Sequence, residues 1–236
     1  MSTNKVALIT GANKGLGFEI ARQLGQQGIT VVLSARDEAK GKAAADQLKA
    51  EGIDAHSVKL DVNKADDIAA LPAFFEKNFG RLDILVNNAG INLDKGLQTS
   101  PESFRQTYET NVIAPWFIAR ALLPLLKDSP AGRIVNHSSI LGSLTILSTE
   151  MRDAILPAYN SSKSALNMLT VQLANALRDT RIKVNAGHPG WVKTDMGGEQ
   201  APMEIVDGAK TAVTLALLPD DGPTGGYFHA GQPLPW

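Results

Sequence analysis

Six short apolar segments alternate with six helical patterns along this chain, and that alternation limits the possible fold more than any other feature. The apolar segments occupy residues 5–10, 30–35, 55–60, 83–89, 132–138 and 181–187. The helical patterns lie near residues 16–28, 37–51, 64–79, 103–127, 157–178 and 203–218. Continuous apolar strands are buried on both faces, so the alternation predicts a parallel sheet with helices on each side. A short last strand at residues 227–230 is expected to add an edge.

The length and composition of the chain fit one domain of this kind. Its 236 residues and 44% hydrophobic content suffice for a single large core. The 23 basic and 24 acidic residues nearly balance, so we expect no nucleic-acid partner and no anionic membrane surface. No apolar run reaches the length of a membrane span, and no signal peptide is expected. Cysteine is absent, which excludes disulfides and thiol catalysis, and the expected location is cytoplasmic.

A glycine-rich turn joins the first strand to the first helix. The run TGANKGLG places Gly11, Gly15 and Gly17 at this turn. Glycine allows a sharp turn and the close approach of a pyrophosphate, which the positive end of a helix attracts. The spacing Gly-x-x-x-Gly-x-Gly differs from the commonest dinucleotide fingerprint. Alone, the run fits a plain tight turn equally well.

The end of the second strand bears on which dinucleotide would bind. Where an NAD site usually carries an acid, this chain has Ala35, and Arg36 follows. A guanidinium can hold a 2′-phosphate through two charge-assisted hydrogen bonds, and Lys14 can add a second positive charge. The alternative is a pair of ordinary solvated cations, with Asp37 neutralising Arg36. The residues favour NADPH as the cofactor.

Tyr159 and Lys163 are four residues apart, which places a phenol and an ammonium on one face of a helix. Free tyrosine titrates near pH ~10, so acid chemistry near neutrality requires a lowering of roughly three units, about 4 kcal/mol. A lysine ammonium within reach of the oxygen can supply an effect of that size. Alone, the pair fits a half-buried tyrosine beside a solvated lysine.

Other candidates follow the remaining strands at the same edge of the predicted sheet. They are Asp61 after the third strand, Asn88-Ala89-Gly90 after the fourth, Ser139 after the fifth and Pro189-Gly190 after the sixth. The ordered set TGANKGLG, LDV, NNAG, Asn111, Ser139, YNSSK and HPGWVKTDM resembles the short-chain dehydrogenase/reductase family from end to end. The segments PGWVKTDMGG and GGYFHAGQPLPW are most similar to its carbonyl reductase branch. This resemblance implies one NADP(H)-binding domain over residues 1–236, with an α/β, Rossmann-type, doubly wound parallel sheet and helices on both faces.

The resemblance implies catalytic roles for four residues. Tyr159 would be the general acid that protonates a carbonyl oxygen, and Lys163 would lower its pKa and bind the nicotinamide ribose. Ser139, rather than Ser138, would hold that oxygen where negative charge develops. Asn111 would hold a water that connects Lys163 to solvent. In the structural alternative, the serines satisfy backbone groups at a strand end and Asn111 is a buried amide.

The resemblance also implies a cofactor site along the edge of the sheet. Asp61 and Val62 would border the adenine, and Val192 and Thr194 the nicotinamide carboxamide. The implied NADPH-binding residues are Gly11, Asn13, Lys14, Gly15, Leu16, Gly17, Arg36, Asp61, Val62, Asn88, Ala89, Gly90, Tyr159, Lys163, Pro189, Gly190, Val192 and Thr194. No metal site is expected, because the histidines near the site lack the clustering of a metal centre.

These residues lead us to expect an NADPH-dependent oxidoreductase that reduces a small, mainly apolar ketone or aldehyde to the alcohol. The segments 140–157 and 189–203 would border the substrate pocket. Its apolar lining would come from Leu141, Leu144, Ile146, Leu147, Met151, Trp191 and Met203, whose alternative role is core packing. Two other functions stay open: an NADP-dependent alcohol or hydroxysteroid dehydrogenase working oxidatively, and a non-catalytic NADPH sensor.

The helices near 103–127 and 157–178 are apolar on more than one face. Surplus apolar surface favours a partner, so a homo-oligomer, either dimer or tetramer, is expected. The number of residues between Ser139 and Tyr159 exceeds that in the family's tetrameric members, so a monomer remains possible.

Overall fold

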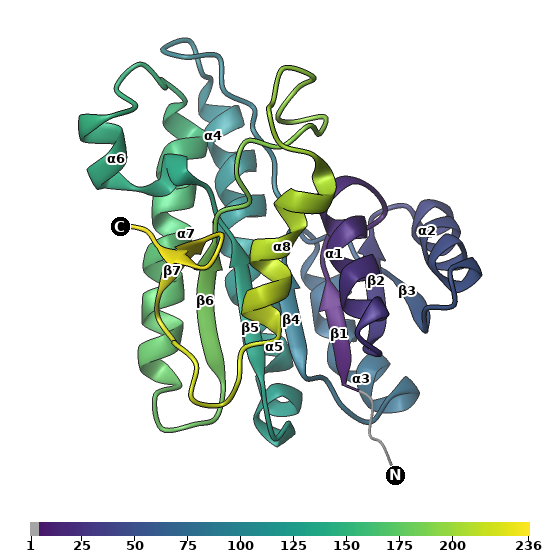
Figure 1. The fold of residues 1–236 in the computed structure, drawn as a ribbon. Helices are drawn as coiled ribbons and strands as arrows, with labels where there is room; N and C mark the ends of the chain where they lie inside the picture. Colours follow the sequence, from purple (N-terminus) through teal and green to yellow (C-terminus); the bar gives the residue numbers. More distant parts are fainter. Residues whose placement is uncertain (1–4) are drawn as a thin grey trace.

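The computed structural model describes residues 5–236, and its centre is an eight-stranded sheet in the order β3-β2-β1-β4-β5-β6-β7-β8 (Figure 1). The strands are β1 (Val6–Ile9), β2 (Thr30–Ala35), β3 (Ala55–Lys59), β4 (Ile84–Asn87), β5 (Arg133–His137), β6 (Lys183–Gly187), β7 (Tyr227–His229) and β8 (Gln232–Pro233). Strands β1 to β7 are parallel, and β8 pairs antiparallel with β7. The predicted parallel sheet is confirmed.

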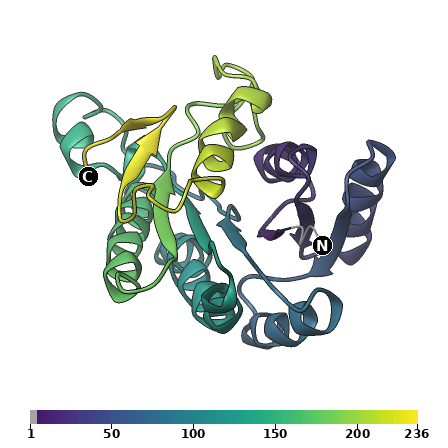
Figure 2. The same ribbon diagram turned by 60° about the horizontal axis from the view of Figure 1, so that its bottom comes forward.

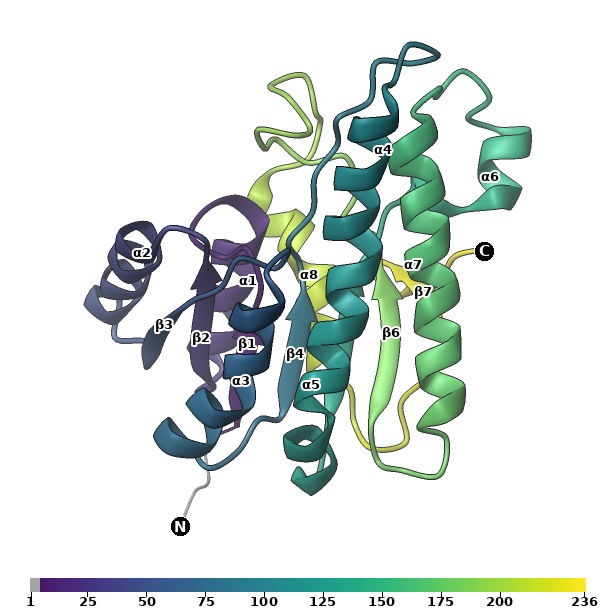
Figure 3. The ribbon, with the colours of Figure 1, turned by 180° about the vertical axis from the view of Figure 1, so that it is seen from behind.

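Helices cover both faces of the sheet, as Figure 2 shows from below. One face carries α1 (Gly15–Gln26), α2 (Glu38–Ala50) and α8 (Ile205–Ala216). The other carries α3 (Ala65–Asn78), α4 (Pro101–Tyr108), α5 (Ala114–Asp128) and α7 (Pro157–Ala176), which Figure 3 shows from behind. A 3-10 turn, η2 (Ile140–Gly142), and a short helix, α6 (Leu144–Thr149), lie between β5 and α7.

The central strands are apolar throughout because both of their faces are covered. Every residue of β1, β2 and β4 is buried. Leu8 and Val32, partners across β1 and β2, face the core under α3, α5 and α7, whereas their neighbours Ile9 and Leu33 face the core under α1, α2 and α8. This alternation explains why the strands read as continuous apolar runs.

The strand order reverses at β1, which pairs with β2 on one side and with β4 on the other. In open α/β sheets, ligands bind beyond the carboxyl ends of the strands at such a switch point. The turn after β1 and the NNAG segment after β4 therefore lie side by side where a dinucleotide is expected.

Three elements differ from the sequence-based expectations. The helix expected near 103–127 is two helices joined by a π-helical turn, η1 (Glu109–Ile113), which contains Asn111. The segment 140–157 is only partly irregular, because Ser139 and Ser143 cap η2 and α6 with their side chains. The edge strand is β8, which pairs with β7 through a two-residue turn at Ala230 and Gly231, both with positive φ.

Within residues 5–236, every helix is too short or too polar to cross a membrane.

Candidate active site

The glycine turn after β1 uses glycine for two reasons, positive φ angles and the close approach of neighbouring backbone. Gly11 and Gly15 have φ angles of 62° and 58°, in the region that favours glycine. A Cβ at Gly17 would lie 2.5 Å from the Nδ2 atom of Asn88 and 2.7 Å from the Gly11 carbonyl oxygen. This close packing requires glycine at Gly17, and a helix N-terminus directly after the turn favours an anion.

Thr10 joins the glycine turn to the NNAG segment, a role that the sequence reasoning missed. Its Oγ1 atom accepts hydrogen bonds of 3.0 Å from the main-chain amides of both Asn88 and Ala89. The Asn88 side chain returns a 2.9 Å hydrogen bond to the Thr10 carbonyl oxygen. The sequence clue to this role is the threonine directly before Gly11, because a threonine hydroxyl can form hydrogen bonds with main-chain groups of a neighbouring turn. Together these bonds fix the floor of the proposed cofactor site.

The two cations expected at a 2′-phosphate are both exposed. Lys14 precedes α1, and its ammonium pairs with the Asp195 carboxylate at 2.5 Å, with side-chain exposures of 72% and 83%. Arg36 follows β2 and is also exposed. An exposed ion pair contributes about 0–1 kcal/mol, so a phosphate with two charges can displace Asp195.

Asp61 and Val62 follow β3 and have different surroundings. Val62 is buried, at 8% exposure, in the core beneath α3 and α5. Asp61 is partly buried; its main-chain amide donates to Asp67 at 2.8 Å, and its side chain accepts from the Asn63 amide at 3.1 Å. These bonds hold the backbone after β3 at the carboxyl edge of the sheet.

Lys163 is buried on α7, with 4% exposure. Its ammonium donates a 2.8 Å hydrogen bond to the His137 carbonyl oxygen, and its Nζ atom lies 5.6 Å from the centroid of the Tyr159 ring. A Cβ at Gly90 would lie 3.6 Å from the same Nζ atom, so the lysine also faces the NNAG segment. Burial lowers the pKa of Lys163 to about 8, because the charged form loses its hydration.

The pKa of Tyr159 differs from the expectation. Burial raises the pKa of the phenol above its ordinary value, and a hydrogen bond with Ser139 partly opposes that rise. The expected lowering by Lys163 is absent from this balance; its ammonium donates to the His137 carbonyl oxygen and lies 5.6 Å from the centroid of the Tyr159 ring. The phenol is thus fully protonated at neutral pH, which suits a proton donor.

The two serines after β5 have different partners, which separates their roles. The Ser138 hydroxyl is buried and donates a 2.6 Å hydrogen bond to Asn167. The Ser139 hydroxyl accepts a weak 3.2 Å bond from the Leu141 amide and lies beside the Tyr159 phenol. Of the two serines, Ser139 is therefore the one beside the Tyr159 phenol.

Asn111 is buried in the π-helical turn, and its side chain is engaged at both ends. Its Nδ2 atom donates to the Ile91 carbonyl oxygen at 2.9 Å and to the Ser162 hydroxyl at 3.0 Å. Its Oδ1 atom accepts from the Ile91 amide at 2.9 Å. Both amide hydrogens are used, so the side chain has no donor left for a water. The side chain ties the segment after β4 to α7, which is the structural role considered for it above.

The segment after β6 forms the remaining wall of the site. Gly190 has a φ of 99°, and a Cβ there would lie 2.7 Å from the Met203 sulfur. Val192 is buried and bridges to Met203, while the Thr194 hydroxyl accepts from the Gly197 amide at 3.1 Å. Among the other apolar residues expected at the pocket, Ile146 is buried, whereas Leu144 and Trp191 are 69% and 57% exposed. Leu144 and Trp191 therefore do not serve as core packing, the alternative role considered for them.

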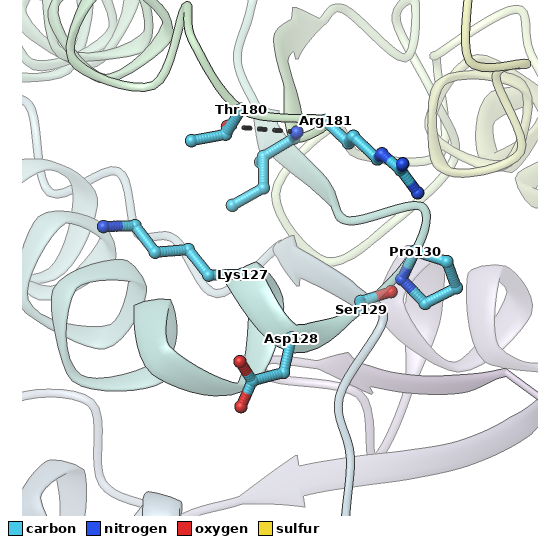
Figure 4. A pocket seen from close by; sticks show the side chains of 7 residues that line it. Lys127, Asp128, Ser129, Pro130, Thr180 and Arg181 are labelled. Carbon is cyan, nitrogen blue, oxygen red and sulfur yellow. Dashed lines mark hydrogen bonds between the residues drawn. The ribbon is translucent and has the colours of Figure 1, made fainter.

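Of two cavities in the described part of the chain, one lies away from the residues expected at the site, and the other is lined in part by Val62. One of about 480 Å³ is lined by Lys127, Asp128, Ser129, Pro130, Thr180, Arg181 and Ile182 (Figure 4). It lies beside the amino ends of β5 and β6, at the edge opposite Tyr159. A second, of about 440 Å³, lies between α3 and α5.

Two histidines near the site stay neutral. Burial, followed by the charge of Lys163, lowers the pKa of His137 to about 3, and burial lowers that of His188 to about 3. Across the described part of the chain, no three histidine or acidic side chains gather as a metal site requires.

Comparison with known proteins agrees with this geometry. Residues 5–205 match the short chain dehydrogenase family. Carbonyl reductase [NADPH] 1 of Bos taurus is 38% identical over 278 residues, which cover 100% of this chain and 99% of the bovine protein. The NADPH-bound carbonyl reductase from chicken fatty liver superimposes with a TM-score of 0.88 at 27% identity, covering 99% of both chains. Salutaridine reductase from Papaver somniferum gives a TM-score of 0.85 at 30% identity and covers 96% of this chain and 100% of its own.

The resemblance inferred from the motifs is thus confirmed over the whole described chain. Because the family match covers most of the sequence and the fold agrees with solved relatives, this chain belongs to the short-chain dehydrogenase family.

Proposed function

We propose that this protein is an NADPH-dependent reductase of small, mainly apolar ketones and aldehydes, with Tyr159 as the general acid. The observation that most supports this proposal is that Tyr159, Ser139 and Lys163 lie close together beside the NNAG segment. A protonated phenol next to a serine hydroxyl gives two hydrogen-bond donors for one carbonyl oxygen. NADPH, when bound, supplies the hydride that the carbonyl carbon accepts.

Each residue has a distinct part in this proposal. The Ser139 hydroxyl holds the carbonyl oxygen, and the Tyr159 phenol gives it a proton as negative charge develops there. The Lys163 ammonium binds ribose hydroxyls of the cofactor. Lys14 and Arg36 hold the 2′-phosphate of NADPH. The similarity to carbonyl reductases that use NADPH supports this choice of cofactor.

The deciding experiment compares Tyr159→Phe with Tyr108→Phe, which removes the phenol at the end of α4. NADPH oxidation would be followed against aliphatic, aromatic, cyclic and quinone carbonyls. We expect Tyr159→Phe to lose nearly all turnover and keep its NADPH affinity within a few-fold, because only the transferable proton is lost. A variant that kept about a tenth of wild-type kcat would exclude Tyr159 as the acid.

The same panel separates the alternatives. An enzyme working oxidatively would turn over alcohols or hydroxysteroids with NADP⁺ faster than it reduces their ketones. A non-catalytic sensor would bind NADPH and show no turnover with any carbonyl or alcohol. The set of Ser139, Tyr159 and Lys163 supports catalysis, since a sensor has no need of a proton donor.

A further inference from the structure

The helix that carries Tyr159 has no cap of its own. Helix α7 begins at Pro157, and the preceding Leu156 has no side-chain hydrogen bond to the helix. The first turn of any helix leaves main-chain N–H groups without helical partners. Proline has no N–H group, so the unpaired donors here belong to Ala158 and Tyr159.

Both of these amides are bound by one carboxylate from a distant part of the chain. Asp94 accepts a 3.0 Å hydrogen bond from the Ala158 amide at Oδ1 and a 2.7 Å bond from the Tyr159 amide at Oδ2. The partners are 64 and 65 residues apart in the sequence. A carboxylate at a helix N-terminus is favoured by the helix dipole, and charged acceptors make the stronger hydrogen bonds.

The Asp94 carboxylate is itself held in place. The Thr99 hydroxyl donates to Oδ1 at 2.8 Å, and the Lys95 amide donates to the Thr99 hydroxyl at 2.8 Å. The Asp94 amide donates to the Asn92 side chain at 3.1 Å, which forms a tight local turn. The segment 91–99 directly follows the NNAG segment, so Asp94 links the floor of the cofactor site to the helix that presents the phenol.

We infer that Asp94 is a positioning residue for Tyr159. By binding two amides of the first turn of α7, its carboxylate fixes the main chain from which the phenol extends toward Ser139. This inference rests on the proposed function, because the position of the phenol matters to turnover only if Tyr159 donates the proton. A shift of about 1 Å in a reacting group can cost about 100-fold in rate.

The test compares Asp94→Ala and Asp94→Asn with Ser100→Ala. Ser100 lies in the same segment and caps α4 by accepting a 3.1 Å bond from the Ser103 amide, so its variant loses a helix cap without touching Tyr159. Asp94→Ala is expected to lower kcat about tenfold while the KM for NADPH stays within about twofold. Asp94→Asn keeps one acceptor oxygen and should fall between Asp94→Ala and wild type. Ser100→Ala should keep wild-type kcat.

Amide hydrogen exchange gives a readout that is independent of activity. The Ala158 and Tyr159 amides should exchange faster in Asp94→Ala than in wild type or Ser100→Ala. Unchanged exchange at these amides, or an equal loss of kcat in Ser100→Ala, would overturn the inference. If Asp94→Ala does not fold, Asp94→Asn carries the same comparison. If Tyr159→Phe remains active, the proposed function fails; if it is inactive while both Asp94 variants keep wild-type kcat, only the role of Asp94 fails.

Discussion

The buried ammonium of Lys163 donates a 2.8 Å hydrogen bond to the main-chain carbonyl oxygen of His137. This bond ties the middle of the proposed site to the end of β5, two residues before Ser139. The lysine therefore faces the Tyr159 ring from a fixed position, and burial sets its pKa at about 8.

The first prediction concerns the pH dependence of turnover. Since the pKa of Lys163 is lowered to about 8, its ammonium is charged below that pH and neutral above it. kcat/KM for carbonyl reduction should thus fall above about pH 8, with kinetics measured from about pH 6 to pH 10. Lys163→Arg, whose charge persists, should lose this fall even if its turnover is lower. A wild-type profile that stays flat to pH 10 would contradict the assignment.

The second prediction concerns the choice of cofactor. Because Arg36 and Lys14 are exposed where a 2′-phosphate is expected, kcat/KM should favour NADPH over NADH at least tenfold, roughly 1.4 kcal/mol. Arg36→Asp should erase or reverse this preference with little change in kcat, since the contact is far from the reacting carbon. Arg178→Asp, the same charge change at an exposed residue after α7, should keep the preference. Equal use of both cofactors by the wild type would refute the prediction.

The third prediction concerns stability in acid. Burial lowers the pKa of His137 to about 3, from an ordinary value of ~6.5. Between these two pH values the unfolded chain binds a proton at His137 that the folded chain does not bind. The free energy of unfolding should fall by about 2 kcal/mol between pH 7 and pH 5 from this residue alone.

Urea unfolding at pH 7 and pH 5 would measure this effect. His137→Asn should lose part of the acid sensitivity, because the amide does not titrate. The Lys163 bond goes to the main-chain carbonyl of residue 137 and would remain. His56→Asn, on the exposed side of β3, is the matched control. Equal acid sensitivity in His137→Asn and wild type would contradict the prediction.

The fourth prediction concerns assembly. Apolar side chains on the helical face formed by η1, α5 and α7 are exposed, including Ile113 at 39%, Phe117 at 45% and Met168 at 58%. Light scattering at micromolar concentration should give a multiple of the 25.1 kDa chain mass, and Phe117→Glu should lower it. Val206→Glu, which alters an exposed apolar residue on α8 across the sheet, should leave it unchanged. A wild-type mass near 25 kDa would establish a monomer.

Much of the fold could be predicted from the sequence because its signals are local. The strands begin and end within a few residues of the apolar runs, since a strand covered on both faces must be apolar throughout. Gly11 and Gly15 lie where positive φ angles are needed, and that requirement depends only on the backbone of the turn. Parallel strands bring their carboxyl ends to one edge, which is why the order of the motifs along the chain was enough to group Ser139 with the NNAG and Pro189-Gly190 segments.

The sequence did not determine the partners of those residues. Nothing local to Asp94 indicates that its carboxylate binds the Tyr159 amide, and nothing in the spacing of Tyr159 and Lys163 indicates a bond to His137. The same holds for Asn111, whose side chain joins Ile91 to Ser162. Torsion preferences and periodicity act between neighbours in the chain and determined the elements. Hydrogen-bond partners and burial, which sets the pKa values, arise only when elements distant in sequence pack together and exclude water.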